Sequence, residues 1–263
     1  MIGGNKLVEI HNTSIIEEGA IIGDGVKIGP FCIIGKDVKI GANTTIQSHV
    51  VIEGITEIGE NNTIYSFASI GKVNQDLKYK GEPTKTIIGN NNTIREFVTI
   101  HRGTDDKWET RIGNNNLLMA YVHVAHDVII GDNCIFSNNA TLAGHVVIDD
   151  WVIIGGMTPV HQFCRIGAHA MVGGASAVTQ DVCPFILADG NKVVPAGLNN
   201  VGLRRRGFTD EELLELKRAY KTIFRKGLPL KAAIQELEET YPESKNVMYL
   251  VDFIKNSKRG IVK

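Results

Sequence analysis

The sequence predicts a mainly β protein: a parallel β-helix built of hexapeptide repeats, followed by a C-terminal α-helical domain. A large apolar residue recurs at every sixth position, and a small side chain often lies four residues after it. Glycine frequently follows the large residue, and Asn and Asp fill much of the remainder. The recurring residues run in three blocks, from Ile10 to Ile70, from Ile88 to Ile100 and from Ile112 to Val178, after which the repeat fades.

The period of six indicates this fold because no helix has it, whereas a short strand, a turn and a corner together do. A hexapeptide repeat is a signature of the parallel β-helix. Gly, Asn and Asp tolerate the positive φ angles and tight bends that its corners need. Since three hexapeptides make one triangular coil, residues 18 apart should stack about 4.8 Å from each other.

Two segments interrupt the repeat and are expected to form loops. Residues 71–86 drop the apolar anchors, and residues 103–110 replace one hexapeptide. Loops that project from a rigid scaffold often carry function. A plain solvated loop is the alternative for the first segment, which holds a dense polar group beside Tyr79: Asn74, Gln75, Asp76 and Lys78.

The C-terminal part is expected to be a connector followed by helices. Residues 180–200 contain two prolines and several glycines, as connectors do. Thr209 and Glu212 form a capping box before an apolar pattern of helical spacing that ends at Gly227. Two further helices fit residues 230–241 and 244–257. The predicted domains are therefore residues 1–189, the β-helix, and residues 190–263, the connector and helical domain.

Composition narrows the function classes. The 263 residues carry a formal net charge of −1, and 22% of them are charged. This balance argues against nucleic acid as a partner. No apolar run reaches the roughly 18 residues that a membrane span needs, and residues 1–9 lack a signal-peptide core. We therefore expect a cytoplasmic protein without membrane insertion, and the scattered cysteines predict neither a zinc framework nor disulfides.

Four of the eight histidines fall together when the coil length is subtracted. His145 minus 18 gives position 127, and His161 minus 36 gives position 125, beside His123 and His126. A single histidine on a β-helix is usually just solvated, but four on one edge over successive coils predict a functional site. His101 plus 18 gives position 119, on a different part of the coil.

Longer motifs carry a family resemblance. The segments VNQDLKYKGEPT, TIHRGT, HVAHD, NNATLAGHV, GGMTPVHQF and GLRRRGF stand in the order seen in the UDP-N-acetylglucosamine O-acyltransferases of lipid A biosynthesis. The resemblance runs nearly end to end. It implies a left-handed parallel β-helix, an exception to the right-handed crossover rule, that assembles as a homotrimer with sites between subunits. It also implies transfer of an (R)-3-hydroxyacyl group from acyl carrier protein to the sugar 3-hydroxyl, with no cofactor and no metal.

The resemblance also implies roles for single residues. His126 resembles the general base, and Asp127 the carboxylate that orients it. Gly144 resembles the residue whose backbone N–H stabilises the oxyanion. His101, which is off the edge of the other histidines, is expected to join from a neighbouring subunit. Positions for sugar, phosphate or acyl chain are matched by Gln75, Asp76, Lys78, His101, His123, His145, His161 and Gln162.

Further matches lie near the C-terminus. Asn199, Arg205 and Arg206 resemble the segment that contacts uridine and phosphate, although Val201 stands where a member of the family has Glu. Gly174 matches the position that limits acyl length, and a glycine there favours about fourteen carbons or more. Lys192 replaces a histidine near the far end of the same groove.

The acidic acyl carrier protein should dock on basic residues, for which residues 204–206 and the first C-terminal helix are candidates, although these could form a plain solvated helix.

Other functions remain open at this point. A related N-acyltransferase would carry an extra N-terminal domain, for which the repeat start at Ile10 leaves no room. A zinc lyase of the γ-carbonic-anhydrase type would use three histidines, for which His101, His123 and His126 are candidates. A non-enzymatic scaffold has no reason to align histidines. The sequence does not decide between a 3-hydroxyl and a 3-amino acceptor.

Overall fold

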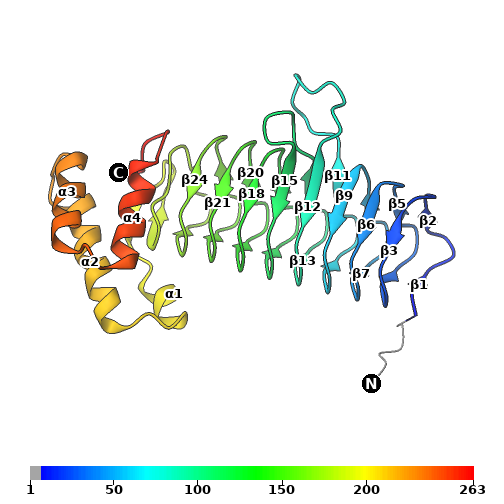
Figure 1. Ribbon diagram of the computed structural model, residues 1–263, viewed down its shortest axis with the longest axis horizontal. Coiled ribbons are helices and arrows are strands. Elements are labelled where there is room, and N and C mark those ends of the chain that lie inside the picture. The colour runs from blue at the N-terminus through cyan, green and yellow to red at the C-terminus, as the bar shows by residue number, and fades with distance from the viewer. Residues whose placement is uncertain (1–6) are drawn as a thin grey trace.

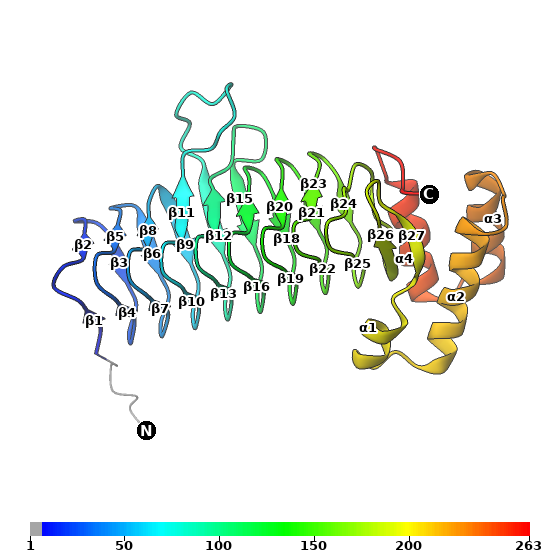
Figure 2. The same ribbon diagram turned by 180° about the vertical axis from the view of Figure 1, so that it is seen from behind.

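The computed structural model describes residues 7–263, which form a long β-helical rod with a group of helices at its C-terminal end (Figures 1 and 2). Each hexapeptide gives one short strand followed by a tight corner, so successive strands pass to successive faces of a triangular prism. The three faces are three sheets, and the fold is the left-handed parallel β-helix with C-terminal helices that the sequence predicted.

The first face is an 11-stranded sheet that continues into the C-terminal part of the chain. Its strands are parallel except for the last pair, which forms an antiparallel hairpin. In spatial order they are β1 (Glu9–Ile10), β4 (Lys27–Ile28), β7 (Thr45–Ile46), β10 (Thr63–Ile64), β13 (Thr93–Ile94), β16 (Leu117–Leu118), β19 (Ile135–Phe136), β22 (Ile153–Ile154), β25 (Met171–Val172), β26 (Ile186–Asp189) and β27 (Val194–Leu198).

The other two faces are 8-stranded parallel sheets. The second face consists of β2 (Ile15–Ile16), β5 (Ile33–Ile34), β8 (Val51–Ile52), β11 (Ser69–Lys72), β14 (Thr99–His101), β17 (His123–Val124), β20 (Thr141–Leu142) and β23 (Pro159–Val160). The third face consists of β3 (Ile21–Ile22), β6 (Val38–Ile40), β9 (Ile55–Ile58), β12 (Lys85–Ile88), β15 (Glu109–Ile112), β18 (Ile129–Ile130), β21 (Val147–Ile148) and β24 (Arg165–Ile166).

The prism is filled by the repeating apolar residues. The second residue of most strands points inward, as in the fully buried column Ile34, Ile52, Ile70, Ile100 and Val124. Burying such a side chain contributes about 1.5–3 kcal/mol relative to leaving it in water. Because every coil repeats the same inner positions, the core is a continuous column that holds the corners in fixed places.

Each of the three edges has its own side chains at corners with positive φ. The "aromatic edge", between the first and second faces, carries Phe31, His49, Phe67, Phe97, Tyr121, Asn139, Met157 and Ala175. The "histidine edge", between the second and third faces, carries Trp108, Asp127, His145 and Phe163. The "asparagine edge", between the third and first faces, carries Asn43, Asn61, Asn91, Asn115, Asn133, Trp151, His169 and Phe185.

Two loops leave the rod on the same side, where they lie next to each other in both views (Figures 1 and 2). They connect β11 to β12 and β14 to β15. Backbone pairing resumes at Lys85 after the first loop and at Glu109 after the second, slightly earlier than the predicted ends at 86 and 110. The loops therefore add residues to two coils without changing the strands around them.

The C-terminal part contains α1 (Asn200–Arg205), α2 (Asp210–Phe224), α3 (Leu230–Thr240) and α4 (Lys245–Lys255). The capping box of Thr209 and Glu212 is present, so the start of α2 is as predicted. One prediction was wrong, and one element was missed. Residues 180–200 are not only a connector, because β26 and β27 form a hairpin there that spans the expected boundary at 189, and α1 was not predicted. No helix within residues 7–263 is long and apolar enough to cross a membrane.

Candidate active site

His126 and Asp127 form a hydrogen-bonded pair on the histidine edge, directly after β17. His126 Nδ1 lies 2.8 Å from Asp127 Oδ2, and the His126 side chain is 16% exposed whereas that of Asp127 is fully buried. Asp127 has a φ of 59°, a conformation that Asp and Asn adopt more readily than most residues. Because the carboxylate engages Nδ1, the second ring nitrogen, Nε2, can act on a substrate.

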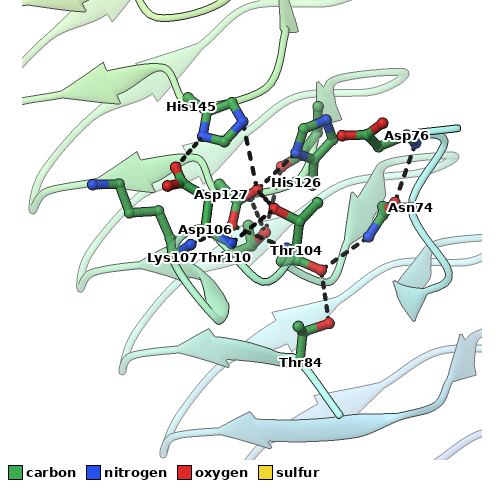
Figure 3. A network of polar contacts seen from close by, with 12 residues as sticks. Asn74, Asp76, Thr84, Thr104, Asp106, Lys107, Thr110, His126, Asp127 and His145 are labelled. Atoms are coloured by element: carbon green, nitrogen blue, oxygen red, sulfur yellow. Dashed lines mark hydrogen bonds and ion pairs between the residues drawn. The ribbon is translucent and has the colours of Figure 1, made fainter. Parts of the chain in front are cut away.

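Asp127 is held by the second loop as well as by His126 (Figure 3). Thr104 donates its backbone N–H to Oδ1 at 3.0 Å and its hydroxyl to Oδ2 at 2.7 Å. The backbone N–H of Lys107 donates to Oδ1 at 3.3 Å. Burial alone would raise the pKa of Asp127, but the hydrogen bonds from His126 and Thr104 keep that pKa below its ordinary value. The carboxylate is therefore charged at neutral pH and selects the His126 tautomer with the proton on Nδ1.

The two loops are joined to each other at Gly103. The carbonyl oxygen of Gly103 accepts hydrogen bonds from Asn74 Nδ2 at 2.9 Å and from Thr84 Oγ1 at 2.7 Å. The next residue is Thr104, so the first loop positions the second, and the second positions Asp127. Thr84, Thr104 and Thr110 were not among the predicted site residues. The Thr110 hydroxyl accepts a hydrogen bond from the Asp127 backbone N–H at 2.9 Å. The signal in the sequence that could have indicated them was the loop inserted one coil before His126.

Gly144 lies against the imidazole of His126 on the next coil. A Cβ at this position would be 2.5 Å from His126 Cε1 and 2.7 Å from Nε2, so any side chain here would force the His126 ring to move. The adjacent His145 donates its backbone N–H to the His126 carbonyl at 3.1 Å. Gly144 thus lies beside His126 Nε2, and its oxyanion role stays a prediction.

His145 completes the wall of a cavity of about 290 Å³. Its ring lies 5.1 Å from that of His126 and stacks on Phe163 at 4.5 Å between centroids. His145 Nδ1 is 3.1 Å from Asp106 Oδ2, a contact that the sequence did not indicate. Asp76 and Lys78 of the first loop line the same cavity, so the structure brings them together with His145. Gln75 is exposed in the same loop.

His101 lies next to His123 on the second face of the same subunit. The expectation that His101 joins the other histidines from a neighbouring subunit was therefore wrong. The ring centroids are 4.9 Å apart, and Ile100 pairs with Val124. The register fails because the second loop lengthens this coil, so the stacked residues differ by 24 rather than 18. Burial, together with the charges of His123 and His126, lowers the pKa of His101 to about 4.

The predicted line of four histidines is only partly correct. His126 and His145 meet edge to face at the histidine edge, close to the position that the 18-residue rule indicated. His123 instead lies on the second face, where Thr99 Oγ1 is 2.7 Å from its Nδ1. Phe163, not His161, continues the stack beyond His145. His161 and Gln162 are exposed one coil further on.

The remaining predicted contacts lie on other edges. Asn199 and Arg206 border the asparagine edge: Asn199 Nδ2 donates to the His169 carbonyl at 2.9 Å, and the Arg206 guanidinium lies 5.2 Å from the Trp151 ring centroid. Arg205 and Val201 are exposed nearby. Gly174 lies beside Ala175 on the aromatic edge, and Lys192 is exposed in the β26–β27 turn. Within one chain, these residues do not line the cavity at His145.

The arrangement differs from the three-histidine zinc site considered above. In residues 7–263, the group whose ligand atoms lie within 4.8 Å of one another is His126, Asp127 and His145, without His101 or His123. Asp127 is already fully engaged by Thr104, Lys107 and His126. This donor set fits an orienting carboxylate better than a metal ligand.

A hexapeptide β-helix with a carboxylate-oriented histidine at its edge defines a hexapeptide acyltransferase. The hexapeptide transferase model matches residues 19–54 and 109–144, and the model described as "Udp N-acetylglucosamine O-acyltransferase; Domain 2" matches residues 181–262. The acyl-[acyl-carrier-protein]–UDP-N-acetylglucosamine O-acyltransferase of Fusobacterium nucleatum is 76% identical over 98% of this chain and 100% of its own.

Two solved structures are also similar to this chain over nearly its whole length. LpxA from Acinetobacter baumannii, whose structure is solved, is 49% identical in sequence, with a TM-score of 0.94 over 97% of this chain and 99% of its own. The UDP-N-acetylglucosamine acyltransferase of Bacteroides fragilis is 44% identical, with a TM-score of 0.95 over 97% of this chain and 100% of its own. The chain belongs to the UDP-N-acetylglucosamine O-acyltransferase family and is an acyltransferase.

Proposed function

We propose that this enzyme transfers a 3-hydroxyacyl group from acyl carrier protein to the 3-hydroxyl of UDP-N-acetylglucosamine, with His126 as the general base. The observation that carries the proposal is the His126–Asp127 pair, with Nδ1 bound to the carboxylate and Nε2 against Gly144. The names of the relatives supply the donor and the acceptor.

His126 would act on the acceptor first. A sugar hydroxyl is a poor nucleophile at neutral pH, and a positioned imidazole that accepts its proton contributes about 10²–10⁴ in rate. As the oxygen attacks the thioester carbonyl, the proton moves to Nε2 and Asp127 stabilises the resulting imidazolium. When the C–S bond breaks, His126 returns the proton to the carrier thiolate. The products are the acylated sugar nucleotide and the free carrier thiol, and His126 is again neutral.

Gly144 would stabilise the intermediate. Attack on the thioester places a negative charge on the former carbonyl oxygen, and a backbone N–H beside the base is suited to bind it. The absence of a side chain allows the close approach, since a Cβ would strike the His126 ring. Asp76, Lys78 and His145 line the cavity where the sugar would bind. We assign the further substrate contacts to Gln75, His101, His123, His161 and Gln162.

The assembly would be a homotrimer with the substrate between subunits. Asn199, Arg205 and Arg206 are on a different edge from His126, so one nucleotide can contact both groups only if a second copy supplies one of them. The aromatic edge offers an interface, because Phe67, Phe97 and Tyr121 are stacked yet 48%, 41% and 55% exposed. Exposed apolar patches of this kind mark association surfaces. In this arrangement Gly174 and Lys192 would line the acyl groove, and the glycine would leave room for a long chain.

The decisive experiment is an assay of EDTA-treated protein with UDP-N-acetylglucosamine and a series of 3-hydroxyacyl carrier proteins, with products identified by mass spectrometry. We expect an acylated sugar nucleotide without added metal, and loss of at least about 10²-fold activity in His126→Ala with the trimer intact. His11→Ala, a change far from the site, is the control. Activity that requires zinc, or a His126→Ala variant as active as the parent, would contradict the proposal. A 3-amino sugar nucleotide, tested in parallel, identifies the acceptor atom.

A further inference from the structure

Arg102 lies in the segment TIHRGT, and the proposed function leaves its side chain unused. It directly follows β14 and precedes Gly103, where the second loop begins. The side chain is only 17% exposed. Arginine side chains are mostly exposed, and buried ones are paired. The contacts of Arg102 therefore indicate what this guanidinium holds in place.

Two glycines provide the space around the guanidinium. A Cβ at Gly54 would be 2.4 Å from Arg102 Nη2, so a side chain there would displace the guanidinium. A Cβ at Gly71 would be 2.1 Å from the Glu53 carbonyl oxygen. The φ angles of the two glycines are 65° and 75°, in the left-handed region that favours glycine. The sequence therefore leaves room for Arg102 at the place where the chain turns out of the rod.

Arg102 binds the start of the first loop through its side chain and its backbone. Its Nε donates a hydrogen bond to the Gly71 carbonyl oxygen at 2.8 Å, and its Nη2 lies 3.6 Å from Glu53 Oε1. The other carboxylate oxygen, Glu53 Oε2, lies 2.6 Å from Lys72 Nζ. The backbone N–H of Arg102 donates to the Lys72 carbonyl at 3.1 Å. Since Gly71 and Lys72 end β11, Arg102 holds the strand end from which the first loop leaves the rod.

The second loop starts from the same place. The Gly103 N–H donates to the Lys85 carbonyl at 3.1 Å, and the Gly103 carbonyl accepts the two hydrogen bonds from the first loop described above. Thr104 comes next and binds the Asp127 carboxylate through its backbone N–H and its hydroxyl. The planar guanidinium of Arg102 donates in two fixed directions at once, which a lysine cannot do. It therefore joins the start of one loop to the start of the other.

We propose that Arg102 is a positioning residue that holds both loops for the reaction, an inference that rests on the function proposed above. Through Thr104 it orients Asp127, and through the first loop it places Asp76 and Lys78 in the cavity. It acts on the reacting atoms only through these residues. A misplacement of about 1 Å can cost about 10² in rate. Loss of Arg102 should therefore reduce kcat through the second loop and raise the KM for the sugar nucleotide through the first.

The first variant is Arg102→Met, which removes the guanidinium, keeps an unbranched side chain and leaves Glu53 paired with Lys72. We expect kcat to fall at least about ten-fold and the KM for UDP-N-acetylglucosamine to rise, both measured well below the thermal midpoint. Lys39→Met is the matched control. It removes a cation whose carboxylate partner, Glu57, lies 3.1 Å away on the exposed third face, and it should keep the parental kcat and KM.

A double-mutant cycle with Asp127→Asn separates positioning from a general loss of structure. If Arg102 acts on kcat through Asp127, Arg102→Met should change the kcat of the Asp127→Asn enzyme by no more than about two-fold, because coupled residues are not additive. The rise in KM should persist in that background, since it comes from the first loop. A structural defect unconnected with Asp127 would reduce kcat by the same factor in both backgrounds.

Two outcomes would overturn the proposal: an Arg102→Met enzyme with parental kcat and KM, or equal losses of kcat in the two backgrounds. Glu53→Gln removes the charge that faces Arg102 and keeps the side-chain volume, so it should give the same pattern at smaller size and serves as the test if Arg102→Met does not fold. The proposed function would fail separately, if Asp127→Asn alone left kcat unchanged. The KM of Arg102→Met would still test the hold on the first loop in that case.

Discussion

Two buried polar groups in the β-helix obtain their hydrogen bonds in different ways. Asn62, Asn92 and Asn116 form an internal ladder: Asn62 Oδ1 accepts from the Asn92 backbone N–H at 2.8 Å, and Asn92 Oδ1 accepts from that of Asn116 at 2.9 Å. Each rung is satisfied by the next coil. Asp127 is equally buried, but the loop residues Thr104 and Lys107 supply its partners. In the ladder, neighbouring coils of the repeat supply the hydrogen bonds of the buried side chains, which stabilises the rod. At the candidate active site, an inserted loop supplies these hydrogen bonds instead.

The largest effect should come from Asp127→Asn. Oδ1 accepts two backbone N–H groups, so the oxygen of the new amide must stay there and its NH₂ must face His126 Nδ1. His126 would then carry its proton on Nε2 and could not act as a base. We expect kcat to fall by about 10³–10⁴ with the thermal midpoint little changed. Asp132→Asn on the asparagine edge, measured in the same assay, should retain parental activity. A small loss in Asp127→Asn would show that the carboxylate does not select the tautomer.

The pH dependence of stability should next distinguish the asparagine ladder from the histidines near the site. The asparagine ladder contains no titrating group, whereas the pKa of His101 is lowered to about 4, chiefly by burial. The unfolded chain binds a proton near pH 6.5 that the folded chain does not bind until about pH 4, so stability falls as pH falls between these values. The full effect is about 3 kcal/mol. His101→Gln should flatten this part of a denaturation-midpoint profile, measured at constant protein concentration. A profile as steep as that of the parent would mean that other groups cause the loss.

Asn92→Ala tests the ladder itself. The change leaves the Asn116 backbone N–H and the Gly113 carbonyl without their partner in a dry interior. We expect the free energy of unfolding to fall by about 2 kcal/mol, measured by urea denaturation. The kcat of the folded fraction should equal that of the parent, because no site residue contacts Asn92. Asn91→Gly, which removes the exposed side chain at the corner beside it and keeps the positive φ, tests whether the internal position is the cause. If fully folded Asn92→Ala protein had a reduced kcat, the ladder would be part of the site.

The same difference explains how far the sequence could predict the molecule. The strand phase, the buried anchors and the approach of His145 to His126 followed from the constant period, because uninterrupted coils keep an 18-residue register. The position of His101 did not follow, since the second loop changes that register to 24. Thr104 could not be assigned to Asp127 because no period determines a loop's conformation. The β26–β27 hairpin was missed because its strands carry no hexapeptide anchors.

Thr104→Val should give the smallest effect and the sharpest test of loop control. The variant keeps the backbone N–H bond to Asp127 Oδ1 and the volume of the side chain, but it removes the hydroxyl that donates to Oδ2 at 2.7 Å. One hydrogen bond to a charged group contributes about 1.5 kcal/mol or more, so kcat should fall roughly ten-fold. Thr104→Ser retains the hydroxyl and should restore the rate. Since Oδ2 also faces His126, the loss should appear in kcat rather than in the KM for the sugar nucleotide. Unchanged kcat in Thr104→Val would mean that the loop positions Asp127 through its backbone alone.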